Sequence, residues 1–284
     1  MVDIKDFGEY ETAWCPGCGN FGILDALKKA LVACGLGPHE VLIVSGIGQA
    51  AKIPHYLNVN VFNGLHGRAV PVATGAKLAH PGLTVIAESG DGCMYGEGGN
   101  HFISAIRRNI DITMIVHNNQ VYGLTKGQAS PTSDEGFVTK AQPHGVYSSP
   151  FNPLAVAVAL DAGFVARGYA GMKEHLTDLI VRAIRHRGFS LVDILQPCVS
   201  FNKVNTYAWY KERCRELPIG YDPTDRELAF RTALLFGGRI PLGVIYEKTG
   251  RPVFEDRFTA LKNGPLAVQK TDFDALRAII ADLA

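Results

Sequence analysis

Two short polar motifs could together hold a metal ion and a phosphate group. Gly90-Asp91-Gly92 follows one apolar run of residues, and Asn118-Asn119 follows the next, 28 residues on from Asp91 to Asn119. Asp91 offers an anionic oxygen, Asn119 an amide oxygen and the backbone near Val121 a carbonyl, while Mg²⁺ prefers few carboxylates beside phosphate oxygens. Each motif alone is typical of an ordinary turn. The two together at strand ends favour a magnesium–diphosphate site.

The six cysteines are a second source of chemistry, and they are Cys15, Cys18, Cys34, Cys93, Cys198 and Cys214. The C-x-x-C pair Cys15 and Cys18 could be a thioredoxin-like dithiol or two thiolate ligands of a metal or iron–sulfur cluster. A thioredoxin-like fold needs a buried strand directly before the motif, and residues 1–13 are too polar to form one. Cys198 follows another apolar run. The pattern therefore favours a metal or a cluster.

A glycine run over residues 46–51 (GIGQAA) imitates a dinucleotide-binding fingerprint. That fingerprint expects an acidic residue about 20 positions further on, to bind the ribose. No Asp or Glu lies between Glu40 and Glu88, and Pro54 interrupts the expected helix. We therefore exclude NAD at this run. The acid-free stretch carries Lys52 and His66, and it suits either an anionic ligand or an ordinary solvated face.

Apolar runs alternate with helical patterns along most of the chain. We expect helices over 21–34, 67–79, 98–108, 153–161 and 173–186, and strands over 41–45, 83–88, 112–117, 164–168 and 190–195. Residues 118–150 read as a long loop. This alternation predicts an α/β fold with a doubly wound, mainly parallel sheet, in which ligands bind at the carboxyl ends of the strands. We expect residues 1–284 to form one domain, less regular from about residue 200, with helix-like 224–236 and 272–283 and strand-like 242–246.

Composition narrows the function classes. The formal net charge is +1 with no long basic run, which argues against nucleic acid as a partner. No stretch approaches the roughly 20 apolar residues of a membrane span, and no signal-peptide core is present at the start. We therefore expect a cytoplasmic protein that binds no membrane.

Four segments resemble one known family. They are AWCPGCGNFGIL, NGLHGRAVPVATGAKLA, DILQPC and the stretch GDGCMYGEGGNHFISAIRRNIDITMIVHNNQVYGLTKGQASPT. Together they are similar to the beta subunit of 2-oxoacid:ferredoxin oxidoreductases over most of residues 13–202. The resemblance implies the thiamine-diphosphate-binding fold, with Mg²⁺ on Asp91, Asn119 and Val121. It further implies contacts to thiamine diphosphate from Gly46, Ile47, Gly48, His66, Gly90, Gly92, Gly123 and Leu124.

The resemblance also implies a [4Fe–4S] cluster held by Cys15, Cys18 and Cys198. The family's fourth cysteine stands in the first glycine loop, where this chain has Gln49. Either another cysteine substitutes, or a water or hydroxide caps one iron, or the cluster has three irons, or it is absent. Cys93 is the candidate substitute, whereas Cys34 and Cys214 read as buried structural residues.

The implied reaction is the oxidative decarboxylation of a 2-oxoacid to an acyl-CoA, with electrons passed through the cluster to ferredoxin. A larger alpha subunit would supply the Glu that contacts the pyrimidine ring, in a heterotetramer. His66, Leu124 and Thr125 would contact substrate or coenzyme A, although His66 could equally cap a helix. Lys52 matches a lysine that reads the distal carboxylate of 2-oxoglutarate, although a surface lysine is the competing interpretation.

Two alternatives remain from the sequence. A non-redox thiamine-dependent 2-oxoacid decarboxylase subunit would explain Asp91 and Asn119 but would leave the cysteines without a role. A non-catalytic scaffold would retain the fold and bind no cofactor. Iron and thiamine diphosphate contents of the purified complex distinguish the three.

Overall fold

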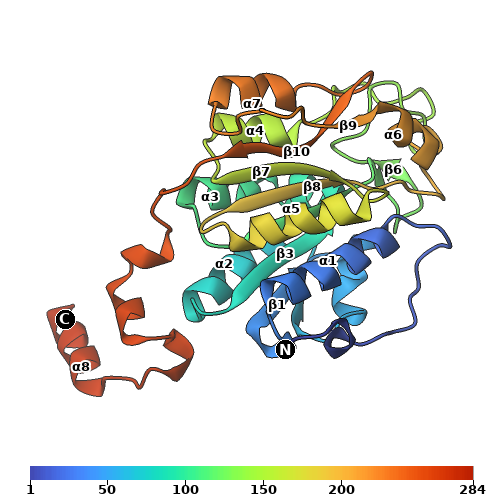
Figure 1. Cartoon of the computed structure of the whole chain (residues 1–284). Coiled ribbons are helices and arrows are strands. Elements are labelled where there is room, and N and C mark those ends of the chain that lie inside the picture. The colour runs from blue at the N-terminus through green and yellow to red at the C-terminus, as the bar shows by residue number, and fades with distance from the viewer. Residues whose placement is uncertain (284) are drawn as a thin grey trace.

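The computed structural model describes residues 1–283, and its centre is an eight-stranded sheet (Figure 1). The strand order is β2-β1-β3-β4-β8-β7-β10-β9, and every pair is parallel except β7 with β10. The strands are β1 (Val41–Ser45), β2 (Asn60–Asn63), β3 (Thr84–Gly90), β4 (Thr113–Asn118), β7 (Phe164–Tyr169), β8 (Ser190–Leu195), β9 (Cys214–Glu216) and β10 (Ile240–Glu247). A small antiparallel ribbon pairs β5 (Val121–Tyr122) with β6 (Gln128–Ala129).

Helices cover both faces of the sheet, as a doubly wound fold requires. The helices α1 (Asn20–Cys34) and α5 (Lys173–Arg185) pack on one face, and α2 (Ala69–Ala79), α3 (Gly99–Arg108), α4 (Pro153–Ala159) and α7 (Arg226–Ala233) pack on the other. The central strands β4, β7 and β8 are buried along their whole length, which explains their continuous apolar sequences. The predicted mainly parallel α/β sheet is therefore confirmed.

The C-terminal third contributes to the sheet and also forms an arm. It adds β9 and β10 to the sheet edge and forms α6 (Tyr207–Arg213), before α8 (Phe273–Asp282) ends an extended arm that leaves the body of the molecule (Figure 1). No residue of α8 is buried. Within residues 1–283, no helix combines the length and the apolar character that crossing a membrane requires.

The parallel pairing brings four strand ends to one edge. The carboxyl ends of β1, β3, β4 and β8 lead into residues 46–49, Asp91, Asn119 and residues 196–198. These are the segments in which the sequence places its polar and cysteine motifs. A π-helical turn over Gly92–Glu97 follows Asp91 directly and precedes α3. Such turns occur often at functional sites.

Candidate cofactor and cysteine site

Asp91 is the central side chain of the site. It is 1% exposed, and its Oδ2 accepts hydrogen bonds from Ser130 Oγ (2.5 Å) and Thr132 Oγ1 (2.6 Å). Burial raises the pKa of its carboxyl group, and the two hydroxyl donors oppose that rise. Because an ionised buried carboxylate costs free energy unless a cation or hydrogen bonds balance it, this position suits a metal ligand.

Asn119 lies beside Asp91 at the end of the neighbouring strand. Its backbone N–H lowers the pKa of the Asp91 carboxyl group. Its side-chain Oδ1 accepts from the backbone N–H of Val121 (3.1 Å), and its Nδ2 donates to Gln196 Oε1 (2.9 Å). The amide is thus held with its oxygen on the side of Val121, so Asp91, Asn119 and Val121 meet as the spacing predicts.

Most of the predicted cofactor residues surround one cavity of about 80 Å³. Its lining includes Ile47, Gly48, His66, Gly90, Asp91, Gly92, Asn119, Val121, Gly123, Leu124 and Thr125. Gly46 lies directly behind it, since a Cβ at Gly46 would stand 2.3 Å from the Sγ of Cys93. Lys52 is half-buried on the turn Ala50–His55 and is not part of this lining.

Gly92 is required by a close contact across the cavity. A Cβ at this position would meet the Tyr122 ring at 2.1 Å. The Tyr122 hydroxyl in turn donates to Glu97 Oε2 at 3.2 Å. The second glycine of the motif therefore makes room for an aromatic ring, in addition to any approach of a phosphate.

His66 is oriented by the same pair of side chains. Its Nε2 lies 3.3 Å from Glu97 Oε2, and its ring meets the Tyr122 ring edge-on with centroids 5.9 Å apart. Its Nδ1 is buried without a hydrogen-bond partner. The imidazole is therefore part of the cavity wall, with one nitrogen fixed by protein and the other free to meet a ligand.

The three predicted cluster cysteines lie on two loops that contact each other. In the C-x-x-C turn the Cys18 N–H donates to the Cys15 carbonyl, and Ser200 Oγ donates to Cys15 Sγ at 3.0 Å. The pKa of Cys18 is raised to about 11, mainly by burial and also by the nearby charges of Cys198 and Cys15. A cationic centre beside Cys18 would offset that cost and favour its thiolate.

A single metal ion is not what this arrangement fits. Within residues 1–283, no group of three or more His, Cys, Asp or Glu side chains has the geometry to hold one ion.

Gln49 and Cys93 are the two residues that bear on the missing fourth cysteine. Trp14 Nε1 donates to the Gln49 carbonyl at 2.8 Å, which fixes the first loop beside the C-x-x-C turn. The Gln49 side-chain oxygen is buried without a partner. Cys93 is buried behind Gly46, where its Sγ accepts the Gly67 N–H at 3.2 Å. That placement favours a structural role for Cys93 beside the cavity over the role of substitute ligand.

The other two cysteines lie elsewhere. Cys34 ends α1, about 22 Å from the start of that helix at 1.5 Å per residue. Cys214 is buried where β9 begins. Both positions are consistent with packing roles.

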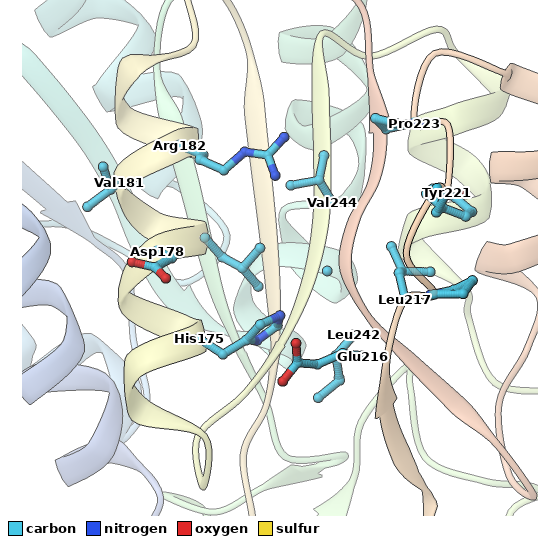
Figure 2. A pocket seen from close by; sticks show the side chains of 14 residues that line it. His175, Asp178, Val181, Arg182, Glu216, Leu217, Tyr221, Pro223, Leu242 and Val244 are labelled. Atoms are coloured by element: carbon cyan, nitrogen blue, oxygen red, sulfur yellow. The ribbon is translucent and has the colours of Figure 1, made fainter.

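A wider cleft lies away from these residues. It measures about 670 Å³ and runs between α5 and residues 216–223 over β10, with His175 and Glu216 directed toward one another across it (Figure 2). None of the sequence-predicted site residues lines it. Most of the predicted cofactor-binding residues line the smaller cavity instead.

Several site residues escaped the sequence analysis. Ser130 and Thr132 hold Asp91 from the long loop, Tyr122 and Glu97 hold His66, and Gln196 holds Asn119. No spacing rule identifies hydroxyls that return from a loop 39 to 41 positions away. The only available signal is the polar run SPTS over residues 130–133 in a loop of functional length.

Comparisons with known proteins agree with this geometry. Residues 37–194 match the family described as thiamine pyrophosphate enzyme, C-terminal TPP binding domain. Residues 198–263 match the family that describes the C-terminal part of the pyruvate ferredoxin oxidoreductase beta subunit. The thiamine pyrophosphate of the first description is thiamine diphosphate. The predicted thiamine-diphosphate-binding fold is confirmed.

Individual relatives point the same way. A 2-oxoacid:ferredoxin oxidoreductase subunit beta from Sulfolobus sp is 44% identical over 91% of this chain and 88% of its own length. The 2-oxoglutarate oxidoreductase subunit KorB of Mycobacterium tuberculosis is 44% identical over 76% of this chain and 58% of its own length.

A solved structure extends the agreement to three dimensions. It is the 2-oxoglutarate:ferredoxin oxidoreductase from Magnetococcus marinus with 2-oxoglutarate, coenzyme A and succinyl-CoA bound, and it matches at a TM-score of 0.91 and 34% identity over 98% of this chain and 96% of that chain. The chain therefore belongs to the beta subunits of the 2-oxoacid:ferredoxin oxidoreductases.

Proposed function

We propose that this subunit binds thiamine diphosphate through Mg²⁺ held by Asp91, Asn119 and the Val121 carbonyl. The observation that carries the proposal is the burial of Asp91 at the end of β3, beside the oriented amide of Asn119. A carboxylate, an amide oxygen and a backbone carbonyl are the hard oxygen donors that Mg²⁺ takes beside phosphate and water. The residues present therefore fit the ion.

We further propose a [4Fe–4S] cluster on Cys15, Cys18 and Cys198. The charges of Cys15 and Cys198 act on Cys18, so the three sulfurs are neighbours, and the side-chain oxygen of Gln49 is buried without a partner; both observations support it. A glutamine oxygen is a poor iron ligand beside thiolates. The fourth iron would then carry either a weak protein ligand or a solvent molecule.

The reaction we propose is the oxidative decarboxylation of 2-oxoglutarate to an acyl-CoA and CO₂, with ferredoxin as the electron acceptor. The names of the M. tuberculosis and M. marinus proteins support this substrate, and Lys52, on the turn Ala50–His55 that follows β1, would supply a cation for a distal carboxylate. We place the enzyme in the cytoplasm with a larger alpha subunit, which brings the Glu that faces the pyrimidine ring.

The residues of this chain would bind the cofactor, orient it and shield it. When bound, thiamine diphosphate supplies the carbanion chemistry. Asp91 and Asn119 anchor the charged end of the cofactor through the metal. His66, held by Glu97 and Tyr122, lines the cavity, and its buried Nδ1 has no protein partner, so it could donate or accept one hydrogen bond. Leu124 and Thr125 form an exposed rim, which substrate or coenzyme A would cover.

The test is Asp91→Ala in the purified complex. Residues that merely orient metal ligands are worth about 10–100-fold in affinity, so loss of the charged ligand should weaken Mg²⁺-dependent binding of thiamine diphosphate by more than roughly 100-fold. Isothermal titration calorimetry measures the affinity, and iron analysis of the same samples checks the cluster independently. Unchanged affinity would refute the magnesium assignment. The control is Asp256→Ala, which removes an exposed carboxylate paired with Arg187.

A further inference from the structure

We propose that Gln196 is a positioning residue that joins the two cofactor sites, orienting the magnesium ligand Asn119 with one end of its amide and supporting the Cys18 thiolate with the other. The inference deepens the proposed function and rests on it. It assigns a task to a residue that lies between the two sites, at the end of β8.

The oxygen end of Gln196 faces the phosphate side. Its Oε1 accepts from Asn119 Nδ2 at 2.9 Å, and its backbone N–H donates to the Asn118 carbonyl at 2.9 Å. The Asn119 amide is therefore held at its nitrogen by Gln196 and at its oxygen by the Val121 N–H. This leaves the remaining lone pair of Asn119 Oδ1 fixed in direction, as a metal ligand requires.

The nitrogen end of Gln196 faces the cysteines. Its Nε2 donates to the Pro197 carbonyl at 2.7 Å and lies 3.6 Å from Cys18 Sγ. The bond to Pro197 fixes which end of the amide points to sulfur, because the reverse orientation would set two oxygens against each other. A neutral N–H donor is thus directed at a proposed cluster ligand.

The sequence makes room for this bridge. Gln196 is 1% exposed, and a Cβ at Gly19 would stand 2.8 Å from its Cγ. The Gly19 N–H also donates to the Pro197 carbonyl at 3.4 Å. Gly19, directly after the C-x-x-C pair, therefore leaves room for the Gln196 side chain. The two motifs CPGCG and QPC consequently pack against each other.

The oxygen end and the nitrogen end of the Gln196 amide each have a measurable consequence. Groups that orient a metal ligand typically contribute about 10–100-fold to metal affinity. Hydrogen bonds to the sulfurs tune the reduction potential of an iron–sulfur cluster. Because such a bond stabilises the more negative, reduced state, removing it should lower the potential.

The experiment compares two variants of the purified complex. In Gln196→Met both ends lose their hydrogen bonds, so the cluster midpoint potential should fall and Mg²⁺-dependent affinity for thiamine diphosphate should drop roughly 10–100-fold. Gln196→Glu keeps an acceptor for Asn119 and loses the donor to Cys18. It should therefore lower the potential while cofactor affinity stays within a few-fold of the native complex. Redox titration followed by electron paramagnetic resonance and calorimetry provide the two readouts.

A control variant, Asn109→Ala, separates an effect on the two cofactor sites from a general loss of stability. Asn109 is another buried amide, bonded to the Arg251 and Pro252 carbonyls at the opposite edge of the sheet. Asn109→Ala should lower the melting temperature and move neither the potential nor the cofactor affinity. If the native complex contains iron and the cluster potential does not move in Gln196→Met, the inference is overturned and the proposed function stands. A native complex without iron would overturn the proposed cluster and the inference together.

Discussion

At the scale of single residues, the cavity shows how few polar groups carry the chemistry. Asp91 and Asn119 are each fixed by two further side chains or backbone groups, whereas the His66 Nδ1 and the Gln49 Oε1 have no partner within residues 1–283. A buried polar atom without a partner costs free energy, and it is most easily explained where a ligand satisfies it. His66 and Gln49 both line the cavity, so a bound cofactor could satisfy these two atoms.

Lys52 gives a prediction about substrate choice. If its ammonium pairs with the distal carboxylate of 2-oxoglutarate, a charge-assisted hydrogen bond of roughly 1.5–3 kcal/mol is lost in Lys52→Met. We expect kcat/KM for 2-oxoglutarate to fall about tenfold to a hundredfold, and kcat/KM for pyruvate to be spared or to improve.

Steady-state kinetics of the complex with both substrates checks this. Lys270→Met, on the exposed arm, is the matched control and should change neither value. An equal loss on both substrates would show that Lys52 does not read the distal carboxylate. A native complex that prefers pyruvate would overturn the substrate proposal and leave the thiamine assignment intact.

At the scale of elements, the sequence predicts the buried strands well and the edges poorly. All five predicted strands of the parallel core, residues 41–45 to 190–195, are found within one or two residues. Their periodicity is strong because both faces are covered. The edge strand β2 was missed because all four of its side chains are exposed, so no apolar pattern marks it.

The same physics explains which site residues were predictable. Polar residues at the ends of adjacent parallel strands must meet, so Asp91 and Asn119 follow from spacing alone. The contacts of Ser130, Thr132 and Gln196 depend on how loops return over that edge, which no local pattern encodes. The antiparallel pairing of β10 was likewise a tertiary outcome, decided by its packing beside β7.

Strand β8 yields a prediction on stability and pH. It carries Asp193 at 2% exposure, and burial, partly offset by the Tyr95 hydrogen bond and the charge of Arg167, raises the pKa of this carboxyl group to about 6. The folded state therefore holds a proton that the unfolded chain has released, so stability from this group is present at low pH and is lost as pH rises through about 6. Between pH 5 and 7.5 the loss should be about 1 kcal/mol.

Asp193→Asn should remove that pH-dependent component. Urea unfolding of the native and variant chains at both pH values measures it, and the difference between their pH dependences isolates this carboxyl from other titrating groups. Asp222→Asn is a suitable comparison, because this exposed carboxyl has a lowered pKa, from hydrogen bonds with Thr224, and should not reproduce the effect. An identical pH dependence in Asp193→Asn would contradict the prediction.

At the scale of the whole molecule, the chain is one subunit of a multi-subunit enzyme family. The arm over residues 258–283 leaves the body and exposes large apolar side chains, among them Phe273, Ile279 and Ile280 (Figure 1). That residues 1–284 form one domain, less regular from about 200, stays a prediction, which limited proteolysis can test. The cofactor cavity is similarly unfinished, because Ile47, Leu124 and Thr125 form an exposed rim.

The size of that cavity leads to a prediction about assembly. It holds about 80 Å³, whereas sites for ligands of the size of a cofactor usually enclose roughly 300–1,000 Å³. If this chain holds the metal-binding end, as proposed, the remaining walls come from another subunit. We therefore expect the isolated chain to bind thiamine diphosphate with Mg²⁺ at least about 100-fold more weakly than the complex does, which corresponds to about 2.7 kcal/mol of contacts made by the partner. Calorimetric titration of both preparations, with circular dichroism to show that the isolated chain is folded, measures the difference. Equal affinity in a folded, isolated chain would mean that the cavity opens by rearrangement of its own loop, and the partner would then be needed for catalysis alone.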